Sequence, residues 1–517
     1  MKKLVEFKNL RRITLEEWNY SMGSLKNKTI SSMILSFTNT IATQFIQLVI
    51  QIVLARILMP KDFGIVGMIT IFITLSQVFV DSGFTTGLVR EKNSSQEDYS
   101  TIFFFNLLVS VLLYIILFFS AGVLGDFYKE PQIKSITRVI SLVLIINAIG
   151  LIQRTMLTKK INFKAQTVID ITAAVISGII AIVFALLGFG VWSLVIKTLT
   201  MQLLQTVFLL VANRWKPTFV FSVTSFKKLF HFSWKLLVAN LLSKLYDSIY
   251  YMIIGKTFTA TDLGYYSKAK ALADIAENSV TNSLQKVSYP VLSNIQNDGD
   301  RLRSGYRKLL KISVYIAFPV MLGLAAVAPE LLIILLGEKW EPAIPYFQIL
   351  CVAGMFYPLH AINLNILQVK GRSDLYLTIS IINEIIGFLM IALVLFFKFG
   401  IIGLMCSIVL DSFISFFTNS YGSKSLLKYS TWEQIKDVFS YFIISIAMCI
   451  LLLVIGNLVS LNIFLMMFLK IFIGVIFYIL MSLIFGFDVF FELIDVISTV
   501  FMKINKNKSM KNEKNKQ

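Results

Sequence analysis

Long apolar segments separated by short polar stretches run through most of the 517-residue chain. A helix needs about 20 predominantly apolar residues to cross the hydrocarbon core of a bilayer. Fourteen segments meet this description, and the seventh and eighth of them are the most polar. The pattern therefore predicts an all-α polytopic membrane protein with about 14 transmembrane helices. The segments are centred near residues 45, 76, 112, 146, 177, 202, 243, 277, 322, 356, 386, 412, 447 and 475.

Four of the segments also carry polar residues at helical spacing. Residues that follow one another at intervals of four and three lie on one face of a helix. On the first segment this face holds Thr40, Gln44, Gln47 and Gln51, and on the second it holds Thr70, Thr74, Gln77, Asp81 and Thr85. On the seventh it holds Asn240, Lys244, Asp247 and Tyr251, and on the eighth it holds Lys270, Asp274, Glu277, Thr281 and Gln285.

The charged residues of the eighth segment indicate where its polar face points. A charged side chain at the centre of a membrane helix costs about 2.5–3.5 kcal/mol on the insertion scale. The charges of this segment would together cost on the order of 10 kcal/mol, while its apolar residues return only about 2–3 kcal/mol. The segment is therefore predicted to line an internal hydrophilic cavity. The charged residues are Lys268, Lys270, Asp274, Glu277 and Lys286.

A second interpretation remains open for two pairs of these charges. Lys244 and Asp247 are three residues apart, and Lys270 and Asp274 are four apart. At these spacings opposite charges form ion pairs within one helix, which would hold the bundle together rather than bind a ligand. This interpretation leaves the Gln and Thr residues of the first two segments unexplained, so the cavity is the prediction for the whole set.

The two halves of the chain show a weak internal repeat. The motif LMPKDFG at Leu58–Gly64 matches FTATDLG at Phe258–Gly264, and GFGVWSL from Gly188 matches KFGIIGL from Lys398. The offsets are 200 and 210 residues, which corresponds to six segments. Because six is even, both halves insert in the same direction. The repeat predicts two six-helix lobes related by a pseudo-two-fold axis along the membrane normal, followed by two C-terminal helices.

Composition supports the membrane assignment and explains the charge. Hydrophobic residues make up 56% of the chain and charged residues 15%, with a net charge of +19. Most Lys and Arg residues fall in the tails and loops that are cytoplasmic when the N-terminus is inside, as the positive-inside rule requires. Both termini are therefore expected in the cytoplasm. The basic residues face an anionic leaflet and need no nucleic acid partner.

The residue types that metal, redox or nucleotide chemistry requires are sparse. Three cysteines lie singly in apolar segments, and two histidines are too few for a His-rich metal site. The sequence contains no Walker A loop and no visible cleavable signal peptide. The loops expected on the outside are short and carry no catalytic constellation. We therefore expect neither an enzyme nor a bound metal or cofactor.

Several stretches of the chain resemble Wzx-type polysaccharide flippases, in the branch that exports colanic acid and teichuronic acid. The likeness covers roughly residues 30 to 430 and depends on the order and spacing of patterns that are not specific individually. The stretches are DLGYYSKAKALADIAENSVTNSLQKVSYPVLSNIQNDGDRLRSGYRKLL, FPVMLGL, LLGEKWEPAIPYFQIL, IQRTMLTKKINFK and LQVKGRSD.

This resemblance implies the fold of multidrug (MATE-type) exporters and lipid II flippases, with helices one, two, seven and eight lining a central cleft. It also implies that the protein moves undecaprenyl-diphosphate-linked oligosaccharide from the inner to the outer leaflet of the bacterial cytoplasmic membrane. Implied partners are this substrate, membrane lipids and polysaccharide polymerase or export machinery. The alternatives are a lipid II-type flippase, which the matched loops disfavour, and a MATE-type drug or cation antiporter, whose cavity should be acidic.

The predicted organisation and site combine these observations. The chain is expected to contain a cytoplasmic tail (1–29), an N-lobe (30–213), a cytoplasmic linker (214–229), a C-lobe (230–424), two further helices (425–490) and a basic cytoplasmic tail (491–517). Lysines suit the diphosphate, and amides and hydroxyls suit sugars. The predicted substrate-binding residues are Gln44, Gln47, Gln77, Asn240, Lys244, Lys268, Lys270, Thr281, Gln285 and Lys286. Predicted sites for coupling to H⁺ or Na⁺ are Asp81, Asp247, Asp274 and Glu277.

Overall fold

The computed structural model describes residues 43–81, 83–91 and 94–495. In this part the chain consists of helices joined by short turns, as the apolar pattern predicts. It divides into two compact units, Met1–Gly264 and Tyr265–Gln517. These units are defined by compactness alone, so they do not test the lobe boundaries predicted from the sequence. Those boundaries remain a prediction.

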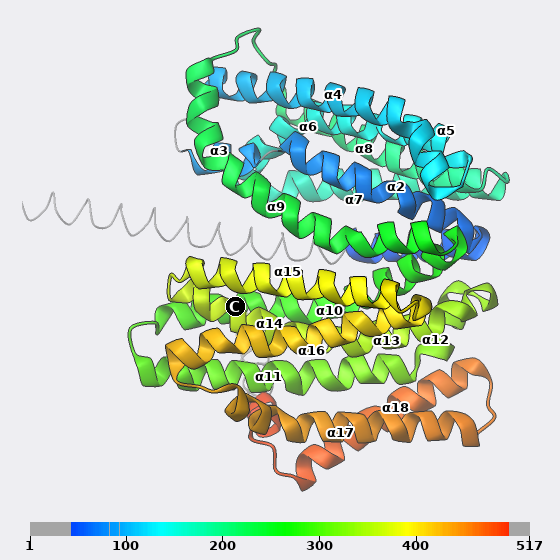
Figure 1. The fold of residues 1–517 in the computed structure, drawn as a ribbon, viewed down its shortest axis with the longest axis vertical. Coiled ribbons are helices and arrows are strands. Elements are labelled where there is room, and N and C mark those ends of the chain that lie inside the picture. Colours follow the sequence, from blue (N-terminus) through cyan, green and yellow to red (C-terminus); the bar gives the residue numbers. More distant parts are fainter. Residues whose placement is uncertain (1–42, 82, 92–93, 496–517) are drawn as a thin grey trace, which may run out of the picture. The chain divides into compact units, whose positions relative to one another are not determined.

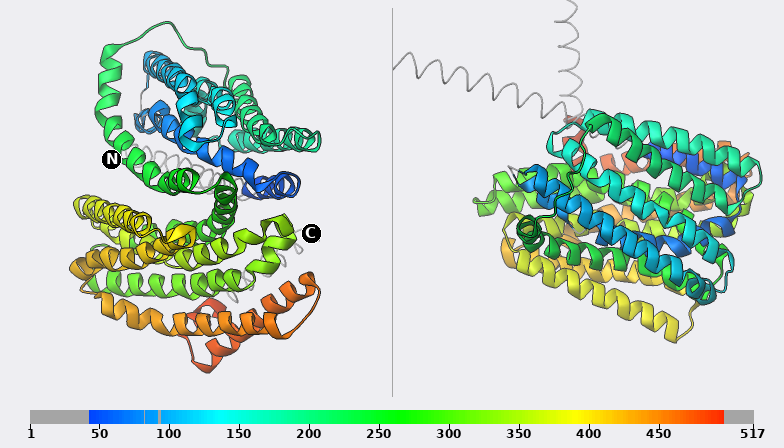
Figure 2. Two further views of the ribbon diagram at one scale, coloured as in Figure 1. Left: turned by 45° about the vertical axis from the view of Figure 1, so that its right-hand side comes forward. Right: turned by 90° about the horizontal axis from the view of Figure 1, so that it is seen from above.

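The first unit is a bundle of long helices (Figures 1 and 2). α6 and α8 pack together, with α4 against α6 and α7 against α8. α2 packs against α4, α6, α8 and α9. The helices are Thr43–Ile57, α2 (Pro60–Asp81), α3 (Phe84–Arg90), α4 (Gln96–Tyr128), α5 (Gln132–Ile140), α6 (Leu142–Lys159), α7 (Phe163–Leu186), α8 (Val191–Asn213) and α9 (Val223–Thr257).

The second unit contains most of α10 (Ala260–Asn294), which begins in the last residues of the first unit. α11 packs against α13, α14 and α17, while α16 packs against α13, α14 and α15. The other helices are α11 (Gly299–Ala326), α12 (Ala328–Leu336), η1 (Glu338–Ala343), α13 (Ile344–Gly354), α14 (Tyr357–Val369), α15 (Ser373–Phe396), α16 (Gly400–Leu427), α17 (Thr431–Leu458) and α18 (Ile463–Ile484).

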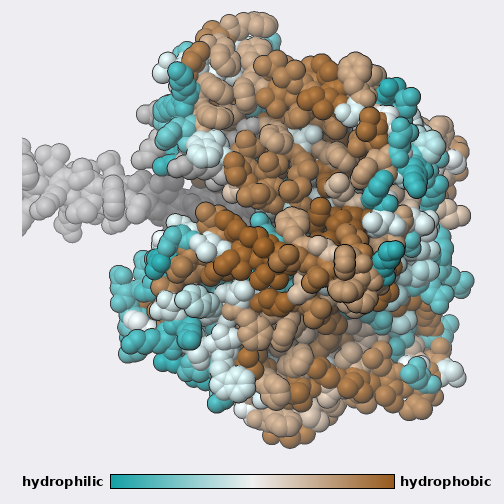
Figure 3. Space-filling view, in the orientation of Figure 1, coloured by the Kyte–Doolittle hydropathy of each residue, from teal (hydrophilic) through white to brown (hydrophobic). Residues whose placement is uncertain are grey.

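Eleven helical stretches in the described part are long and apolar enough to cross a membrane. The 35-residue helices α9 and α10 are not among them, in line with the expectation that the seventh and eighth segments are the most polar. Thr43–Ile57 is a shorter apolar helix. Within each unit, hydrophobic side chains cover the middle of the helices and hydrophilic ones gather at the helix ends (Figure 3). The protein is therefore a multi-pass membrane protein, and the total of about 14 spans remains a prediction.

Some of the predicted segments are broken rather than continuous. The second segment ends as α2 at Asp81 and resumes as α3 after Gly83, whose positive φ of 69° interrupts the helix. The tenth segment is likewise divided into α13 and α14, and the centre predicted near residue 356 falls at this break. Hydropathy detects the apolar stretch, but it does not detect a break in the helix inside it.

Both copies of the repeated motif begin a helix in the same way. In Leu58–Gly64, Asp62 accepts a hydrogen bond of 2.9 Å from the backbone N–H of the residue that precedes α2. In Phe258–Gly264, Asp262 does the same at 3.1 Å for the residue that precedes α10. An acid at the third helical position satisfies a backbone donor that the helix leaves unpaired. The matched Asp residues therefore have a shared local role.

The glycines of the two motifs pack against each other's helix start. A Cβ placed on Gly64 would lie 1.6 Å from the carbonyl oxygen of Ala260. A Cβ placed on Gly264 would lie 1.9 Å from the carbonyl oxygen of Pro60. Small residues allow membrane helices to approach this closely. The repeat detected in the sequence thus forms one reciprocal contact at the end of the first unit.

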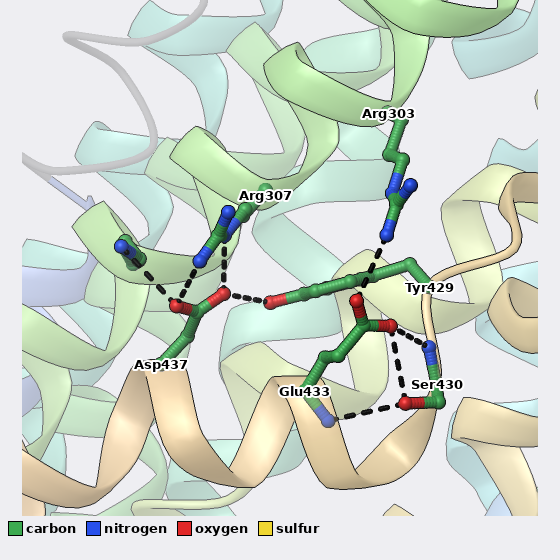
Figure 4. A network of polar contacts seen from close by, with 7 residues as sticks. Arg303, Arg307, Tyr429, Ser430, Glu433 and Asp437 are labelled. Atoms are coloured by element: carbon green, nitrogen blue, oxygen red, sulfur yellow. Dashed lines mark hydrogen bonds and ion pairs between the residues drawn. The ribbon is translucent and has the colours of Figure 1, made fainter.

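A network of charged groups joins the start of α11 to the start of α17 (Figure 4). Arg303 pairs with Glu433 at 2.9 Å, and Arg307 makes two hydrogen bonds to Asp437. The Tyr429 hydroxyl donates to Asp437 at 2.5 Å. Burial raises the pKa of Tyr429, so this hydroxyl keeps its proton and remains a donor. The network holds the α17–α18 hairpin to the rest of its unit.

A buried ion pair provides a second attachment for the same hairpin. The Nζ of Lys470 on α18 pairs with Glu330 on α12 and donates to the Ala326 carbonyl at 3.3 Å. Only 4% of the lysine side chain and 10% of the glutamate side chain are exposed. A Cβ on Gly456 would lie 2.7 Å from Nζ, so this glycine makes room for the ammonium group.

Candidate functional site

The polar face of the first helix is only partly open. Thr40 lies outside the described residues, and Gln44 is exposed at the start of Thr43–Ile57. Gln47 is half-buried, and its Nε2 donates to the Sδ of Met201 on α8 at 3.2 Å. Within one turn, the face changes from an exposed position to a contact inside its own unit.

The polar face of the second segment continues across a break. Gln77 and Asp81 are half-buried near the end of α2. Thr85, which the spacing placed on the same helix, lies on α3 instead. Its hydroxyl nevertheless donates to the Asp81 carboxylate. The predicted residues meet, but through a helix break rather than along one helix face.

The middle of α9 carries the most open polar groups of the predicted site. Asn240 is exposed. Lys244 and Asp247 form an ion pair of 3.1 Å, with 48% and 58% of their side chains exposed. The intrahelical pairing considered as an alternative is therefore present. The pair is nonetheless far from buried, so it contributes little to packing.

The first half of the polar face on α10 holds a similar pair. Lys270 pairs with Asp274 one turn later, with 30% and 38% of their side chains exposed. Lys268 differs from these two residues because only 6% of it is exposed. The four-residue spacing thus identified a real interaction, while the burial of Lys268 could not be predicted from it.

The second half of this face is covered by protein. Glu277 is 9% exposed and Thr281 is 2% exposed, and Gln285 is half-buried. Among the described residues, the Thr281 hydroxyl has no hydrogen-bond partner. The side chain of Lys286 lies outside the described part. The polar face of α10 therefore changes from open near Lys270 to enclosed near Glu277.

The Glu277 carboxylate lies against the end of α13. A Cβ placed on Gly354 would be only 3.1 Å from its Oε2. Cys351, one turn earlier on α13, is fully buried. No periodicity in the sequence connects Glu277 with Gly354, because the contact depends on how α10 and α13 pack. Gly354 is thus a part of the site that the sequence analysis missed.

A polar cluster in the first unit was also missed. Arg154 of α6 pairs with Asp170 of α7 at 2.6 Å, and Gln205 of α8 donates to the same carboxylate at 3.0 Å. The sequence did contain a signal for this cluster, namely an acidic and a basic residue in neighbouring apolar segments. The cluster joins three helices and is neutral as a pair, which is typical of a structural contact.

Several of the predicted residues contact one another locally, whereas Gln47 contacts Met201 of α8 and Glu277 lies against Gly354 of α13. The local contacts join Lys244 to Asp247, Lys270 to Asp274, and Asp81 to Thr85. Within the described ranges, no three His, Cys, Asp or Glu side chains gather closely enough to hold a metal ion. Chemically, the open groups can exchange an intrahelical partner for an anion or for hydroxyl groups.

Comparison with known proteins places these features in a family. A family model described as "Polysaccharide biosynthesis protein" matches residues 53–345. The teichuronic acid biosynthesis protein TuaB of Bacillus subtilis (strain 168) is 26% identical over 303 residues, covering 58% of this chain and 62% of TuaB. The lipopolysaccharide biosynthesis protein WzxC of Escherichia coli (strain K12) is 25% identical over 362 residues, covering 68% and 72%. The chain thus spans less than two thirds of the length of TuaB.

Solved structures show a similar arrangement of helices. The lipid II flippase MurJ in an inward closed conformation matches with a TM-score of 0.72 at 15% identity, covering 87% of this chain and 98% of MurJ. An inward-facing multidrug resistance MATE family transporter of the MOP superfamily matches with a TM-score of 0.59 at 15% identity, covering 74% and 95%. At these identities the likeness concerns the fold alone.

Proposed function

Because the chain belongs to the polysaccharide biosynthesis protein family, we propose that it flips undecaprenyl-diphosphate-linked oligosaccharide units from the inner to the outer leaflet of the bacterial cytoplasmic membrane. The family model matches residues 53–345. Relatives named for teichuronic acid biosynthesis and for succinoglycan biosynthesis transport support this substrate class. The protein acts as a transporter, and its role is to supply lipid-linked units for a surface polysaccharide.

The observation that carries the proposal is the exposure of charged groups in the middle of α9. Lys244 and Asp247, in the middle of the 35-residue α9, keep about half of their side chains exposed. Charged side chains within a membrane helix face water, a cavity or a polar partner. A bundle held together by these charges would bury them. Their exposure favours contact with a polar substrate.

Each predicted residue type has a part in this proposal. Lys244 and Lys270 provide charge-assisted hydrogen bonds to the diphosphate, which competes with Asp247 and Asp274 for them. Asn240 and Gln44 both donate and accept hydrogen bonds, as hydroxyl-rich sugars require. The lipid tail remains in the bilayer while the polar part crosses. Charged and amide groups together thus replace the hydration shell that the substrate loses.

The proposal includes coupling to an H⁺ or Na⁺ gradient. Asp81 and Glu277 are the more enclosed of the predicted acids, while Asp247 and Asp274 already have lysine partners. An enclosed carboxylate is costly to charge, so gain or loss of a cation there changes the energy of the surrounding structure. Glu277, which lies against Gly354 of α13, is the acid best placed to transmit such a change.

A lipid II-type flippase is the second candidate, since MurJ has the same fold. The deciding experiment removes the protein and measures which lipid-linked glycan accumulates on the inner leaflet. Accumulation of a surface-polysaccharide precursor, with lipid II translocation unchanged, is the expected result. Accumulation of lipid II alone would replace the proposal by the second candidate. Unchanged leaflet distributions of both lipids, together with increased cellular retention of cationic drugs, would instead indicate a drug exporter.

A further inference from the structure

A chain of four hydrogen-bonding side chains crosses three helices of the second unit. The Thr418 hydroxyl of α16 donates to Asn383 Oδ1 of α15. Asn383 Nδ2 donates to Asn419 Oδ1 at 2.9 Å. Asn419 Nδ2 lies 3.1 Å from Nδ1 of His360 on α14. None of these four residues belongs to the polar faces that the sequence analysis identified.

The direction of this chain determines the form of the histidine. Because Asn419 Oδ1 accepts from Asn383, its Nδ2 must be the group that faces His360. An amide nitrogen only donates, so Nδ1 of the ring must accept. A neutral imidazole that accepts at Nδ1 carries its hydrogen on Nε2. The chain therefore selects the neutral Nε2–H tautomer.

The Nε2–H group at the end of the chain is an unused donor. Nε2 is inaccessible to solvent and has no hydrogen-bond partner among the described residues, although the residue as a whole is only partly buried. A buried donor without an acceptor costs about 1–3 kcal/mol. The histidine therefore needs another reason for being there.

The same side chains can form the chain in the opposite direction. If both amides turn over, Asn419 Oδ1 accepts from Nδ1–H of the ring and Asn383 Nδ2 donates to Thr418. The Thr418 hydroxyl already has a second acceptor within reach, the Ser415 carbonyl oxygen at 3.1 Å. In this reversed chain every amide group is again satisfied. A hydrogen on Nδ1 is compatible only with the reversed direction.

From this geometry we propose that His360 is a binding site for one proton, and that the Asn419–Asn383–Thr418 chain reverses when the proton binds. The proton adds to the Nδ1 lone pair and gives an imidazolium with both nitrogens protonated, and no other bond breaks. Asn419 then presents its oxygen, and the change passes to α15 and back to α16. Binding of the proton is thereby communicated to three helices.

The charged groups on the helices that pack against α14 are compatible with a cation at His360. On α15, Glu384 is adjacent to Asn383, and on α16, Asp411 is two turns before Asn419. On α11, the Tyr306 hydroxyl donates to Asn363 of α14 at 2.6 Å. The other charged residues of α15 and α16 lie near the helix ends, and those of α11 lie in its first half; they are Asp374, Lys424, Asp300, Arg301, Arg303, Arg307, Lys308 and Lys311. α10 and α17 also contact α14, through Ser288 with Asn365 and Gln434 with Asn363. Their charged residues are Asp262, Lys268, Lys270, Asp274, Glu277 and Lys286 on α10, and Glu433, Lys436 and Asp437 on α17.

A neighbouring network shows what a purely structural arrangement looks like in the same unit. Asn363 accepts from Tyr306 at 2.6 Å and donates to the Leu359 carbonyl at 3.0 Å and to Gln434 at 3.2 Å. It ends on backbone or hydroxyl groups and contains no side chain that titrates near neutral pH. The His360 chain ends on a hydroxyl group only at Thr418, and its other end is a titratable ring with an unused donor.

The proton site rests on the proposed function only in one respect, namely that the proton would drive transport. The first test therefore does not involve transport. The protein labelled with ¹⁵N-histidine and ¹⁵N-asparagine is studied by NMR in lipid nanodiscs between about pH 8 and pH 4, which covers ordinary histidine pKa values with a margin on the acid side. Only His231 and His360 contribute histidine signals, and H231Q leaves one. His231 is exposed on α9 and serves as the matched control.

The expected result is an Nε2–H tautomer at the alkaline end that becomes imidazolium on acidification. The side-chain amide signals of Asn419 and Asn383 should shift with the same midpoint, and N383L should abolish the shift of Asn419. Two results would overturn the proposal. One is a His360 that stays neutral over the whole range, and the other is a His360 that titrates without any change at the two asparagines.

The second test measures flipping of a lipid-linked oligosaccharide in proteoliposomes with and without an imposed pH gradient. The gradient should stimulate the wild type and H231Q, and the stimulation should be lost in H360Q. Equal stimulation of H360Q and wild type would exclude a role of this proton in transport. If the wild type flips no lipid-linked oligosaccharide at all, the proposed function fails, while the NMR result for His360 stands by itself.

Discussion

At the scale of single residues, exposure separates two roles that the sequence left open. Lys244 and Asp247 form the ion pair that their spacing allows, yet about half of each side chain is exposed. Exposed ion pairs contribute only about 0–1 kcal/mol to stability. The pair is therefore a weak structural element, and under the proposed function it binds the substrate.

The first prediction is that K244A changes transport but not stability. We expect thermal unfolding in detergent to shift by no more than the equivalent of about 1 kcal/mol, while flipping of lipid-linked oligosaccharide falls clearly. In K244E, like charges about 4 Å apart repel by about 4 kcal/mol in a dielectric of about 20. Flipping should then fall by roughly several hundredfold.

The matched control is R301E, which reverses the charge of another exposed pair with the same spacing, Asp298–Arg301. It should leave flipping unchanged. The swapped double K244D/D247K restores the ion pair but moves the cation by one turn. Its flipping should stay impaired at normal protein levels, and full activity of the double variant would reduce the pair to a structural one.

The second prediction concerns the enclosed acid on α10. E277Q should remove the part of transport that an ion gradient drives and leave binding of the lipid-linked substrate intact, because the substitution removes only the charge. E277D keeps the charge and should retain part of the gradient response. Flipping with and without a gradient, together with binding of a labelled substrate, measures both. Normal gradient-driven flipping in E277Q and in the corresponding variants D81N, D247N and D274N would exclude these four acids.

At the scale of helices, close approach and capping explain why the repeated motif was visible in the sequence. Asp62 and Asp262 satisfy the helix starts, and Gly64 and Gly264 allow two helices to meet backbone to backbone. A local motif that occurs once in each half of the chain is visible in the sequence as a match at a fixed offset. The contact itself forms between residues that are about 200 positions apart.

The third prediction is that G64A and G264A are both strongly destabilising. The added methyl groups would meet backbone oxygens at 1.6 and 1.9 Å, and backbone cannot yield as a side chain can. Overpacking of this kind costs about 1–3 kcal/mol or more. Thermal unfolding in detergent should show a clearly lower midpoint for each variant.

Two further variants complete this test. G122A, in α4 with nothing within 4 Å of the added Cβ, should be neutral or stabilising by about 0.5–1 kcal/mol. The double G64A/G264A should cost less than the sum of the two single variants, since the first methyl already separates the helices. Additive losses would show that the two contacts are independent.

At the scale of the whole molecule, the orientation of the chain in the membrane determines on which side of the bilayer each helix end lies. The fourth prediction is that an impermeant thiol reagent applied from outside labels only one set of introduced cysteines. The positive-inside distribution of Lys and Arg sets this expectation. Cysteines at Lys61, Lys129 and Lys339 should react, and cysteines at Lys160, Arg303 and Lys370 should not.

The measurement is made in a background in which Cys351, Cys406 and Cys449 are replaced by serine, and permeabilised cells provide the control for reactivity. All six positions should react once the membrane is opened. Reversed labelling at two or more of them would overturn the orientation and, with it, the assignment of inner and outer helix ends.

The features that could be predicted without a structure are those that depend on short-range geometry. Apolar length gave the membrane helices, because each span must satisfy its own backbone within the bilayer. Helical spacing gave the pairs Lys244–Asp247 and Lys270–Asp274, because residues three or four apart meet on any α-helix. The resemblance to polysaccharide flippases, which rests on the order of local patterns, is confirmed by the family model.

Which polar groups are enclosed, and which residues they contact, depends on how the helices pack and could not be predicted from spacing. Gln47 meets Met201, and the Glu277 carboxylate lies against Gly354. Neither contact has a fixed spacing, since both depend on how helices distant in the sequence pack together. The His360 chain across α14, α15 and α16 is of the same kind. Its residues look ordinary in the sequence because the direction of a hydrogen-bond chain arises only when its donors and acceptors are brought together in space.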